Sequence, residues 1–564
     1  EMADQQDHRS LRENERRKED AERAKMFGGP AAINFEEMVL GSTLGAGQYG
    51  TVQKGTCRGS HVAIKVPKKA RLSKREFKQF LEELEIMKNA RHPNVCLLMG
   101  ACYVEGDGAN SGLYIVTELG AGDLENLIIG TDGKKPTKKY PLSVRLNWAT
   151  EAARALAWLH GMKPPILHRD IKLSNILVDQ DMRVKVCDFG LSNRLKPGVD
   201  HIREKKPRGT PLYMAPEVIE RKAVDHKADV YSFAYVLWEM IQQELVFLEY
   251  SDFMKFYTDV IKGGKRPALG AKWEPALCDL LNEMWAPLAD DRPSMKDVAD
   301  KLAPIVDKVK HAERVAALRA RVPDAKAQRF WMDNFFPESS AKWADFAPAF
   351  YKCLGKPVPD HPVVSSALSH SKVVSDTEIL DEETRELLCL YELVEHDGLV
   401  STSSLGGVVA SFAPLDSGFL TRLVDTLRQP WFFGSIPTKA AEQKLCVQSC
   451  GTFLVRFSNS KPGVYCISLV NANKMVQHLV MQHSSQGYRL DTAVNKFWNT
   501  VPEFITANAS KYKLLEACPG WPFEHLFESQ KAGIGGYTAQ FDDDMDDDDM
   551  DDLGARFDKV TAGI

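Results

Sequence analysis

The sequence lacks the features that mark secreted, zinc-bound and membrane-spanning chains. Its eleven cysteines are scattered from Cys57 to Cys518, with no CxxC pair and no cysteine-dense segment. This distribution argues against a disulfide framework or a zinc site and predicts reduced thiols, as in the cytoplasm. The most apolar stretch, Val230 to Ile241, is shorter than the ~18 residues that cross a bilayer, and the first residues lack the apolar centre of a signal peptide. A cytoplasmic chain without a transmembrane segment is therefore expected.

An excess of one charge is also lacking. The formal net charge of the 564 residues is only −5, and both signs are mixed along most of the chain. Nothing in the composition therefore predicts a nucleic-acid partner or an anionic membrane surface.

What is present is enough apolar sequence for roughly two to four domains, since 44% of the residues are hydrophobic and the chain is too long for a single core. Short β-type runs followed by long helical patterns predict a sheet-rich lobe and then a helical lobe, and a second α+β segment with alternating strands follows an aromatic-rich helical connector. The terminal run FDDDMDDDDMDD is too acidic to fold alone. The predicted segments are a charged arm at 1–34, a globular domain at 35–309, the connector at 310–430, the small α+β domain at 431–525 and a disordered acidic tail at 526–564.

The first chemical motif is a glycine-rich loop. Such a GxGxxG pattern alone is weak, because it also marks dinucleotide-binding folds, where a helix follows it. Here the following residues alternate as further strands, which favours a hairpin that closes over nucleotide phosphates. The loop and its second strand comprise Gly45, Ala46, Gly47, Gln48, Tyr49, Gly50, Thr51 and Val52.

A lysine and a glutamate follow this loop. Lys65 ends the run Val-Ala-Ile-Lys, and a helical pattern containing Glu83 comes next. A lysine beside ATP phosphates needs an acidic partner to hold it, and Glu83 has the spacing to supply it from that helix. Glu82 and Glu85 are the local alternatives.

Three further motifs identify the family that residues 35–309 resemble. They are His168-Arg-Asp170-Ile-Lys172-Leu-Ser-Asn175, Asp188-Phe-Gly190 and Gly209-Thr through Ala215-Pro-Glu217. In order and spacing they resemble the eukaryotic protein kinases, and so imply a bilobal kinase fold that uses ATP and Mg²⁺. Asp229 and Arg292 complete the pattern, with Arg292 expected to form a buried ion pair with Glu217. Ala234 stands where kinases commonly have glycine.

The resemblance implies a role for each motif residue. Asp170 would accept the proton of the substrate hydroxyl, Lys172 would steady the transferred phosphoryl group, and Asn175 and Asp188 would hold magnesium. Phe189 would stack with His168, Met87 and Leu98 to align the lobes. The adenine would lie between Leu44, Val52, Ala63 and Leu177, against a hinge formed by Thr117, Glu118 and Leu119.

The wording of the motifs is closest to the tyrosine-kinase-like group. Lys172 and Gly209-Thr210 are choices typical of serine/threonine kinases, and dual specificity stays open because members of this group sometimes phosphorylate tyrosine. Arg169 before the catalytic aspartate often pairs with a phosphorylated activation-loop residue. The loop between Asn193 and Gly209 has no serine, threonine or tyrosine and is strongly basic. Asp200 or Glu204 could supply a built-in anion, the acidic tail could dock there, or the charges could simply form a solvated face.

The segment 431–525 resembles an SH2 domain, which binds phosphotyrosine. The resemblance rests on Trp431-Phe-Phe-Gly434 and on Gly451-Thr-Phe-Leu-Val-Arg456. An arginine inside an apolar run is costly to bury without an anion, and its planar fork suits phosphate.

Three other residues complete the implied phosphotyrosine pocket, and two positions depart from the usual pattern. The implied pocket residues are Arg456, Ser458, Ser460 and His478. A satisfied core histidine is the competing interpretation of His478. Thr438 replaces a second arginine and Val480 replaces a basic residue, although Lys439 could compensate. A non-binding relic is the alternative.

The order kinase, connector, SH2 domain resembles the SH2-domain-containing kinases of social amoebae. We expect an active kinase that phosphorylates proteins and is recruited through phosphotyrosine-bearing partners, including at membrane complexes. The alternative is a catalytically inactive scaffold, which would require the loss of Lys65, Asp170, Asn175 or Asp188. All four are present.

Overall fold

The computed structural model describes most of the chain as two compact units, residues 1–315 and 316–564. The described residues are 32–46, 50–67, 74–104, 112–130, 136, 138–195, 199–203, 206–360, 381–458, 461, 463–484, 487–490 and 497–527. Gly47, Gln48, Tyr49 and Ser460 lie outside them, as do most of the predicted arm and acidic tail. No helix within the described ranges is long and apolar enough to cross a membrane.

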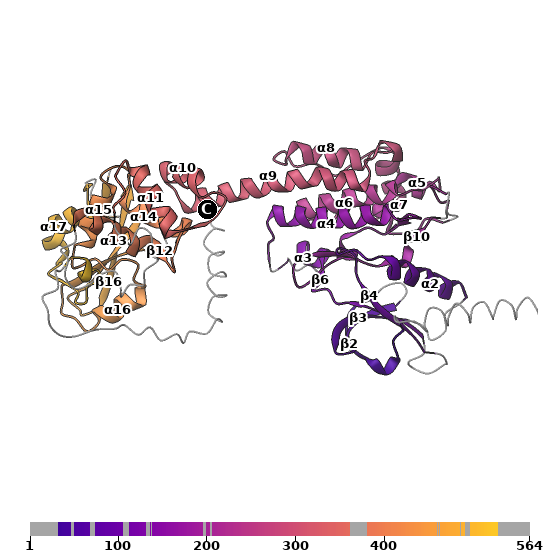
Figure 1. Ribbon diagram of the computed structural model, residues 1–564, viewed down its shortest axis with the longest axis horizontal. Helices are drawn as coiled ribbons and strands as arrows, with labels where there is room; N and C mark the ends of the chain where they lie inside the picture. Colours follow the sequence, from indigo (N-terminus) through magenta and orange to yellow (C-terminus); the bar gives the residue numbers. More distant parts are fainter. Residues whose placement is uncertain are drawn as a thin grey trace, which may run out of the picture. The chain divides into compact units, whose positions relative to one another are not determined.

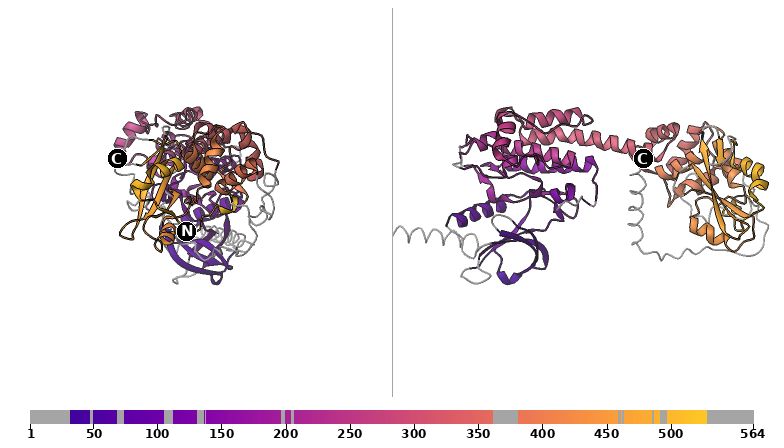
Figure 2. Two further views of the ribbon diagram at one scale, coloured as in Figure 1. Left: turned by 90° about the vertical axis from the view of Figure 1, so that its left-hand side faces the viewer. Right: turned by 180° about the vertical axis from the view of Figure 1, so that it is seen from behind.

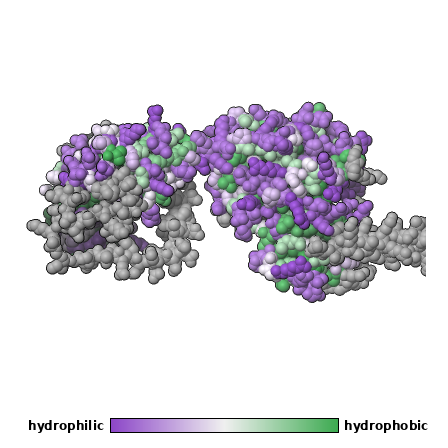
Figure 3. All heavy atoms as spheres, in the orientation of Figure 1, coloured by the Kyte–Doolittle hydropathy of each residue, from purple (hydrophilic) through white to green (hydrophobic). Residues whose placement is uncertain are grey.

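The first unit begins with a five-stranded antiparallel sheet in the order β1-β2-β3-β5-β4. Its elements are β1 (Met38–Ala46), β2 (Gly50–Cys57), β3 (Ser60–Pro67), β4 (Leu98–Val104), β5 (Gly112–Glu118) and the helix α2 (Lys74–Asn89). Figures 1 and 2 show these strands gathered at one end of the unit, with α2 beside them. Val62, Ile64 and Val116 alternate inward and are fully buried, as the strand period requires. On the face shown in Figure 3, hydrophobic residues are frequent over this lobe. Leu44, which lines the cleft described below, is 53% exposed.

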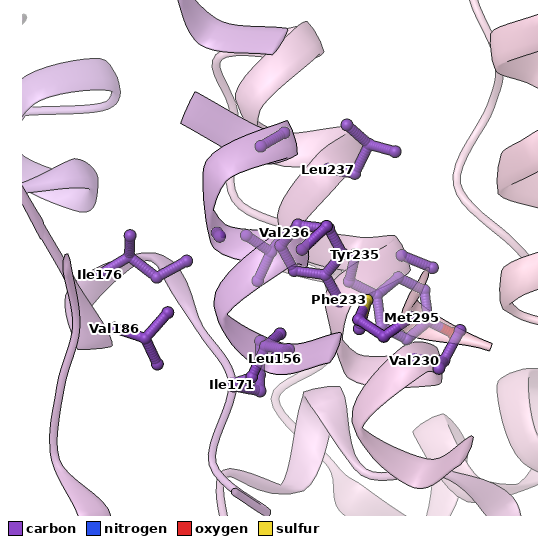
Figure 4. Packing of buried hydrophobic residues seen from close by; sticks show 14 of the residues in the cluster. Leu156, Ile171, Ile176, Val186, Val230, Phe233, Tyr235, Val236, Leu237 and Met295 are labelled. Carbon is purple, nitrogen blue, oxygen red and sulfur yellow. The ribbon is translucent and has the colours of Figure 1, made fainter. Parts of the chain in front are cut away.

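The rest of this unit is mainly helical. Its helices are α3 (Leu124–Ile128), α4 (Leu142–His160), α5 (Pro216–Ile219), α6 (Lys227–Gln242), α7 (Phe253–Phe256), α8 (Pro275–Met284) and α9 (Met295–Arg321). Its short strands are β6 (Gly122–Asp123), β7 (Ile166–Leu167), β8 (Ile176–Val178), β9 (Val184–Val186) and β10 (Asn193–Arg194). The apolar run at 230–241 forms the centre of α6 and is buried throughout, so it is a core helix. Figure 4 shows Phe233 and Val236 of α6 among side chains from other elements, including Leu156 and Ile171. A sheet-rich lobe followed by a helical lobe confirms the predicted fold class.

Two buried charged groups hold the helical lobe together. Arg292 donates to both carboxylate oxygens of Glu217, at 2.7 and 2.9 Å, and its side chain is fully buried. Asp229 on α6 accepts from the backbone N–H groups of His168 and Arg169, both at 2.8 Å, and contacts His160 at 2.8 Å. Burial opposes ionisation of Asp229, but the hydrogen bond from His160 leads the interactions that keep its pKa below the usual range. These contacts fix the segment that carries Asp170.

The second unit starts with two helix–strand–helix segments. They consist of α10 (Ala325–Asn334), β11 (Ser340–Lys342) and α11 (Trp343–Leu354), and of α13 (Glu382–Val394), β12 (Glu395–His396), β13 (Leu399–Ser401) and α14 (Thr402–Phe412), followed by α15 (Phe419–Leu427). The strands form a small antiparallel sheet in the order β11-β13-β12, which joins the two segments. The helical character predicted for the connector is therefore present.

A second five-stranded sheet follows, in the order β17-β16-β15-β14-β18. Its elements are β14 (Thr452–Phe457), β15 (Val464–Val470), β16 (Val476–Ser484), β17 (Gly487–Leu490) and β18 (Glu516–Ala517), with the helices α16 (Thr438–Leu445) and α17 (Val501–Tyr512). One continuous hydrophobic core joins this sheet to the connector helices. At the junction the backbone carbonyl of Ser411 accepts from the hydroxyls of Tyr465 and Tyr488, at 3.1 and 2.7 Å. The connector thus packs as part of the same compact unit as the sheet.

Candidate functional site: a nucleotide cleft and a phosphate pocket

Lys65 and Glu83 meet as an ion pair in the first unit. The Lys65 ammonium lies 2.8 Å from a Glu83 carboxylate oxygen and 3.5 Å from Asp188. Burial disfavours the charge on Lys65, but attraction to Glu83 and then to Asp188 outweighs it, so the pKa of Lys65 is above its usual range. Of the three candidate glutamates, Glu83 is the one that reaches the lysine. Glu85 instead contacts Arg194 at 3.5 Å, and Glu82 is exposed.

Asp170 lies at the centre of a hydrogen-bond network. One of its carboxylate oxygens accepts from the backbone N–H and the hydroxyl of Thr210, at 3.0 and 2.8 Å. The other accepts from the Asn175 side-chain amide at 3.0 Å and lies 3.1 Å from the Lys172 ammonium. Lys172 also donates to the Thr210 hydroxyl at 3.2 Å. The network fixes the orientation of the carboxylate and already brings an aliphatic hydroxyl to it.

Asp188 and Phe189 sit in a sharply bent segment beside this network. Asp188 has a left-handed backbone, with φ of 62°, which is unusual for a residue other than glycine. Burial would raise the pKa of Asp188, but the Lys65 charge leads the interactions that hold it below the usual value. The side chain of Phe189 is buried, and its ring lies 5.3 Å from that of His168, whose Nε2 contacts the Cys187 carbonyl at 3.0 Å. Phe189 therefore contacts His168 as predicted, but the two ring planes are tilted by 57° and do not stack.

A cleft of about 620 Å³ connects these groups. Nine residues predicted to bind ATP line it: Leu44, Gly45, Gly50, Val52, Ala63, Lys65, Thr117, Leu119 and Leu177. Glu83 and Lys172, predicted as catalytic, and Asn175 and Asp188, predicted to hold magnesium, line it as well, whereas Ala46 and Asp170 are not among the lining residues. Glu118 was predicted here, but its side chain accepts from the Leu97 N–H at 2.7 Å and contacts Lys185 at 3.1 Å instead. Thr51 is not among the lining residues either.

The cleft also contains polar residues that the sequence reasoning missed. Asp123, at the start of α3, lines the cleft and caps this helix by accepting from the Asn126 N–H at 2.9 Å. Asn126 and Ser174 line the cleft as well. Asp123 could have been found from the sequence, because an aspartate at a helix N-cap stands six residues after Thr117 and so places a carboxylate just beyond the hinge.

The geometry of the second unit centres on Arg456. This residue lies on β14 and is only 3% exposed. Its guanidinium donates to the Thr438 hydroxyl at 2.8 Å and to the Phe457 carbonyl at 3.2 Å. Thr438, the residue that replaces a second arginine, therefore holds the fork of Arg456 from the first turn of α16. Both of these acceptors are neutral, so neither cancels the arginine charge.

His478 lies on β16, and Ser458 follows β14, with β15 between these two strands. The His478 ring contacts the Ser468 hydroxyl at 2.9 Å and a Glu442 oxygen at 3.1 Å. His478 is half-buried and has partners for both ring nitrogens, so the satisfied-histidine interpretation remains open beside the pocket role. Ser458 follows β14 directly and is half-buried, while Val480 is 42% exposed.

The arginine that precedes Asp170 also donates to a neutral group. Arg169 has φ of 68°, and its guanidinium donates to the backbone carbonyl of Leu191. Asp200 contacts His201 at 2.6 Å and has a side chain 94% exposed, while Glu204 lies outside the described residues. The built-in anion expected for Arg169 therefore stays a prediction.

Comparison with known proteins agrees with both sites. Residues 38–302 match the family of protein tyrosine and serine/threonine kinases, and residues 431–507 match the SH2 domain. The chain is 32% identical over 530 residues to dual specificity protein kinase shkA of Dictyostelium discoideum, covering 92% of this chain and 94% of that protein. It is 31% identical to shkC of the same organism, covering 85% and 89%. Probable serine/threonine-protein kinase SIS8 of Arabidopsis thaliana is 36% identical over 271 residues, covering 48% of this chain and 25% of that protein. The chain belongs to the protein kinases that carry an SH2 domain behind the kinase domain.

Proposed function

We propose that this kinase transfers the γ-phosphate of ATP mainly to serine and threonine hydroxyls of proteins, with tyrosine as a second acceptor. The observation that carries the proposal is the network around Asp170, in which Lys172 and Thr210 converge on one carboxylate. The Thr210 hydroxyl at 2.8 Å from Asp170 supports the view that an aliphatic hydroxyl fits beside this carboxylate. The dual specificity named for the Dictyostelium relatives is the reason for including tyrosine.

The chain's own residues can perform the steps of the transfer. Asp170 takes the proton from the substrate hydroxyl as that oxygen attacks. The Glu83-held ammonium of Lys65 orients the phosphates, and Lys172 lies where charge grows on the transferred group.

The oxygen ligands of the cleft suit magnesium, and Mg²⁺ when bound neutralises phosphate charge. The Asp188 carboxylate and the Asn175 amide oxygen are hard ligands of the kind that this ion prefers. Together with Lys65 and Asp170 they form a complete set, which argues against the inactive scaffold.

The experiment that tests this function is phosphoamino-acid analysis of the purified full chain incubated with MgATP and a generic protein substrate. Phosphoserine and phosphothreonine should dominate, with phosphotyrosine as a smaller product. Asp188→Ala should remove the signal, whereas the matched control Asp181→Ala, in the exposed turn between β8 and β9, should not. A product that is phosphotyrosine alone would contradict the assignment of the main acceptor.

For the second unit we propose that Arg456, Ser458, Ser460 and His478 bind the phosphotyrosine of partner proteins. The burial of the Arg456 guanidinium beside the Thr438 hydroxyl and the Phe457 carbonyl supports this, because a planar guanidinium suits paired hydrogen bonds to a phosphate. A phosphotyrosine-bearing partner would recruit the kinase from the cytoplasm, including to membrane complexes.

A further inference from the structure

The sheet that carries Arg456 has a second face, and the connector covers it. Adjacent residues of β14 point to opposite faces, so Arg456 and Phe457 lie on different sides of the sheet. Phe457 and its partner on β15, Tyr465, belong to the core that the sheet shares with the connector helices. On that side the Phe412 ring of α14 lies 6.0 Å from the Phe457 ring and 6.4 Å from the Tyr465 ring. Helix α14 therefore supports, from the opposite face, the strand that carries Arg456.

The same helix contacts the end of the connection between β14 and β15. Gly463, the last residue before β15, has φ of 74°, and a Cβ there would lie 2.8 Å from the Ala410 carbonyl oxygen. Glycine is required to combine this backbone with so close an approach to α14. At the other end of the connection, the N–H of Ser458 donates to the Val464 carbonyl at 2.8 Å. The position of Ser458, proposed above as a phosphate ligand, therefore depends on α14 through Gly463 and Val464.

One turn earlier, α14 contacts the end of helix α9. Gly406 is buried, and a Cβ at this position would overlap the carbonyl oxygen of Arg321, the last residue of α9. The next residue, Val322, is fully buried, and its carbonyl accepts from the side-chain amide of Gln328 at 2.8 Å. Helix α9 begins at Met295 in the first unit and ends in the second. A single turn of α14 therefore separates its contact with α9 from its contact with the β14–β15 connection.

These two contacts connect the phosphate pocket with the end of α9. A helical turn is stiff and neither contact leaves room for a side chain, so a displacement at one end of the turn moves the other. We infer that α14 couples phosphotyrosine binding to the packing of the end of α9, with Gly406 and Gly463 as positioning residues. A phosphate in the pocket fixes the β14–β15 connection against α14, and so holds α14 against the end of α9. Such coupling is reciprocal, so a well-packed end of α9 raises the affinity for the phosphate. This inference rests on the proposed phosphotyrosine binding.

The first test compares glycine exchanges in the full chain. Gly406→Ala places a methyl group at the contact with Arg321, whereas a Cβ at the neighbouring Gly407 meets no other part of the described chain within 4 Å. Fluorescence anisotropy with a labelled phosphotyrosine peptide should show that Gly406→Ala raises the dissociation constant about fivefold or more, the usual size of a coupling between sites. Gly407→Ala, the matched control on the same helix, should leave this constant unchanged. Gly463→Ala should weaken binding further, because it also strains the backbone beside the pocket.

The second test needs no variant, so it decides the question even if Gly406→Ala does not fold. Saturating the parent chain with the same phosphopeptide should slow amide hydrogen exchange at residues 316–322, which include the end of α9, about fivefold or more. Residues 343–354 of α11, which belong to the same hydrophobic core, serve as the control and should change less.

Three outcomes would overturn the inference. The first is an equal affinity of the parent and of folded Gly406→Ala for the phosphopeptide. The second is slower exchange in β14 without a change at residues 316–322. The third is an equal slowing at residues 316–322 and in α11, because the peptide would then stabilise the whole unit and not this contact. If the parent chain binds neither the phosphopeptide nor phenyl phosphate, the proposed phosphotyrosine binding itself fails.

Discussion

The two units use a buried cation in opposite ways. In the cleft the Lys65 ammonium is paired with Glu83 at 2.8 Å and lies 3.5 Å from Asp188. In the second unit the Arg456 guanidinium is held by neutral oxygens of Thr438 and Phe457. In the first arrangement carboxylates neutralise the cation and fix its position. In the second, the hydrogen bonds described for the guanidinium go to uncharged oxygens, and we propose that a phosphate supplies the negative charge.

This difference between Lys65 and Arg456 indicates a different role for each site. A neutralised lysine adds little to net affinity but fixes the geometry of a reaction, where a small displacement has a large cost. A guanidinium with neutral partners supplies affinity and makes binding strongly dependent on salt. The cleft should therefore lose rate when it is altered, and the pocket should lose binding.

The largest effect should come from Asp170→Asn in the cleft. The change removes the proton acceptor while the neighbouring amide and lysine contacts can persist, so the phosphoryl-transfer rate should fall by about a thousandfold or more. Nucleotide binding, measured by calorimetry with a non-hydrolysable analogue, should remain within about threefold of the parent. If the variant lost nucleotide binding as well as rate, the cleft residues could not be said to set the geometry of the reaction without also setting affinity. A variant that keeps substantial activity would refute the role of Asp170.

Arg456→Ala should have the next largest effect, and on binding alone. Removing the only described guanidinium in this pocket should weaken binding of a phosphotyrosine peptide by about a hundredfold, since charge-assisted contacts dominate phosphate affinity. Fluorescence anisotropy measures this, with Lys511→Ala, which removes an exposed cation of α17, as the control. Rate on a generic substrate should not change. Unaltered peptide binding by the variant would assign the phosphate to another site.

These two sites could be predicted from the sequence because short motifs carry their reactive residues, and the structure brings Lys65, Asp170, Asn175 and Asp188 together as the spacing suggested. The family comparison and the strand patterns likewise agree with the predicted fold. The direction of the Glu118 side chain could not be predicted from the local sequence. Adjacent residues of β5 point to opposite faces, so Thr117 lines the cleft and the Glu118 side chain turns to Leu97 and Lys185.

Tertiary contacts were beyond the sequence patterns. The packing of α14 on the SH2 sheet depends on the Ser411 carbonyl, which accepts from Tyr465 and Tyr488, and a backbone carbonyl has no sequence signature. The same applies to the hydrogen bond from Arg456 to Thr438. In the sequence, Thr438 was noticed only because it replaces a second arginine. The sequence motifs therefore predicted candidate reacting groups but not the groups that hold them.

A smaller effect is expected at Glu239, a buried carboxyl group whose hydrogen-bond partners are uncharged. Glu239 is fully buried, and one of its oxygens accepts from the Tyr213 hydroxyl at 2.6 Å and from the Val246 N–H at 3.0 Å. Burial raises the pKa of Glu239 to about 8. The unfolded chain loses this proton near pH 4.5 and the folded chain keeps it to about pH 8, so this group makes stability fall as pH rises between those values.

Glu239→Gln removes this titration. The free energy of unfolding of the variant, relative to the parent, should therefore increase from pH 5 to pH 8, by a few kcal/mol at most. Urea denaturation of both proteins at several pH values measures the difference. Glu220→Gln is the control, because hydrogen bonds from Lys222 and Lys262 hold the pKa of Glu220 below its usual value of 4.5 and its difference from the parent should therefore stay constant between pH 5 and pH 8. A difference between Glu239→Gln and the parent that does not depend on pH would show that the carboxyl is ionised in the folded protein.

The smallest effect is expected from removing phosphate, and it follows from the way Arg169 is held. Like Arg456, Arg169 contacts a neutral oxygen, the Leu191 carbonyl, and the loop beside it is fixed by Gly209 and by the Ile202–Val224 bridge. Because residues 193–209 contain no serine, threonine or tyrosine, we expect activity not to depend on phosphorylation within this loop. Purified enzyme treated with a broad phosphatase, then freed of it, should keep an initial rate within about twofold of the untreated enzyme. Ser192 and Thr210 are the nearest hydroxyls, and Thr210 is already bonded to Asp170. Loss of nearly all activity, restored as phosphate returns to Ser192 or Thr210, would contradict this prediction. It would show that Arg169 needs an anion to order the loop, so that its contact with a neutral carbonyl is not sufficient for activity.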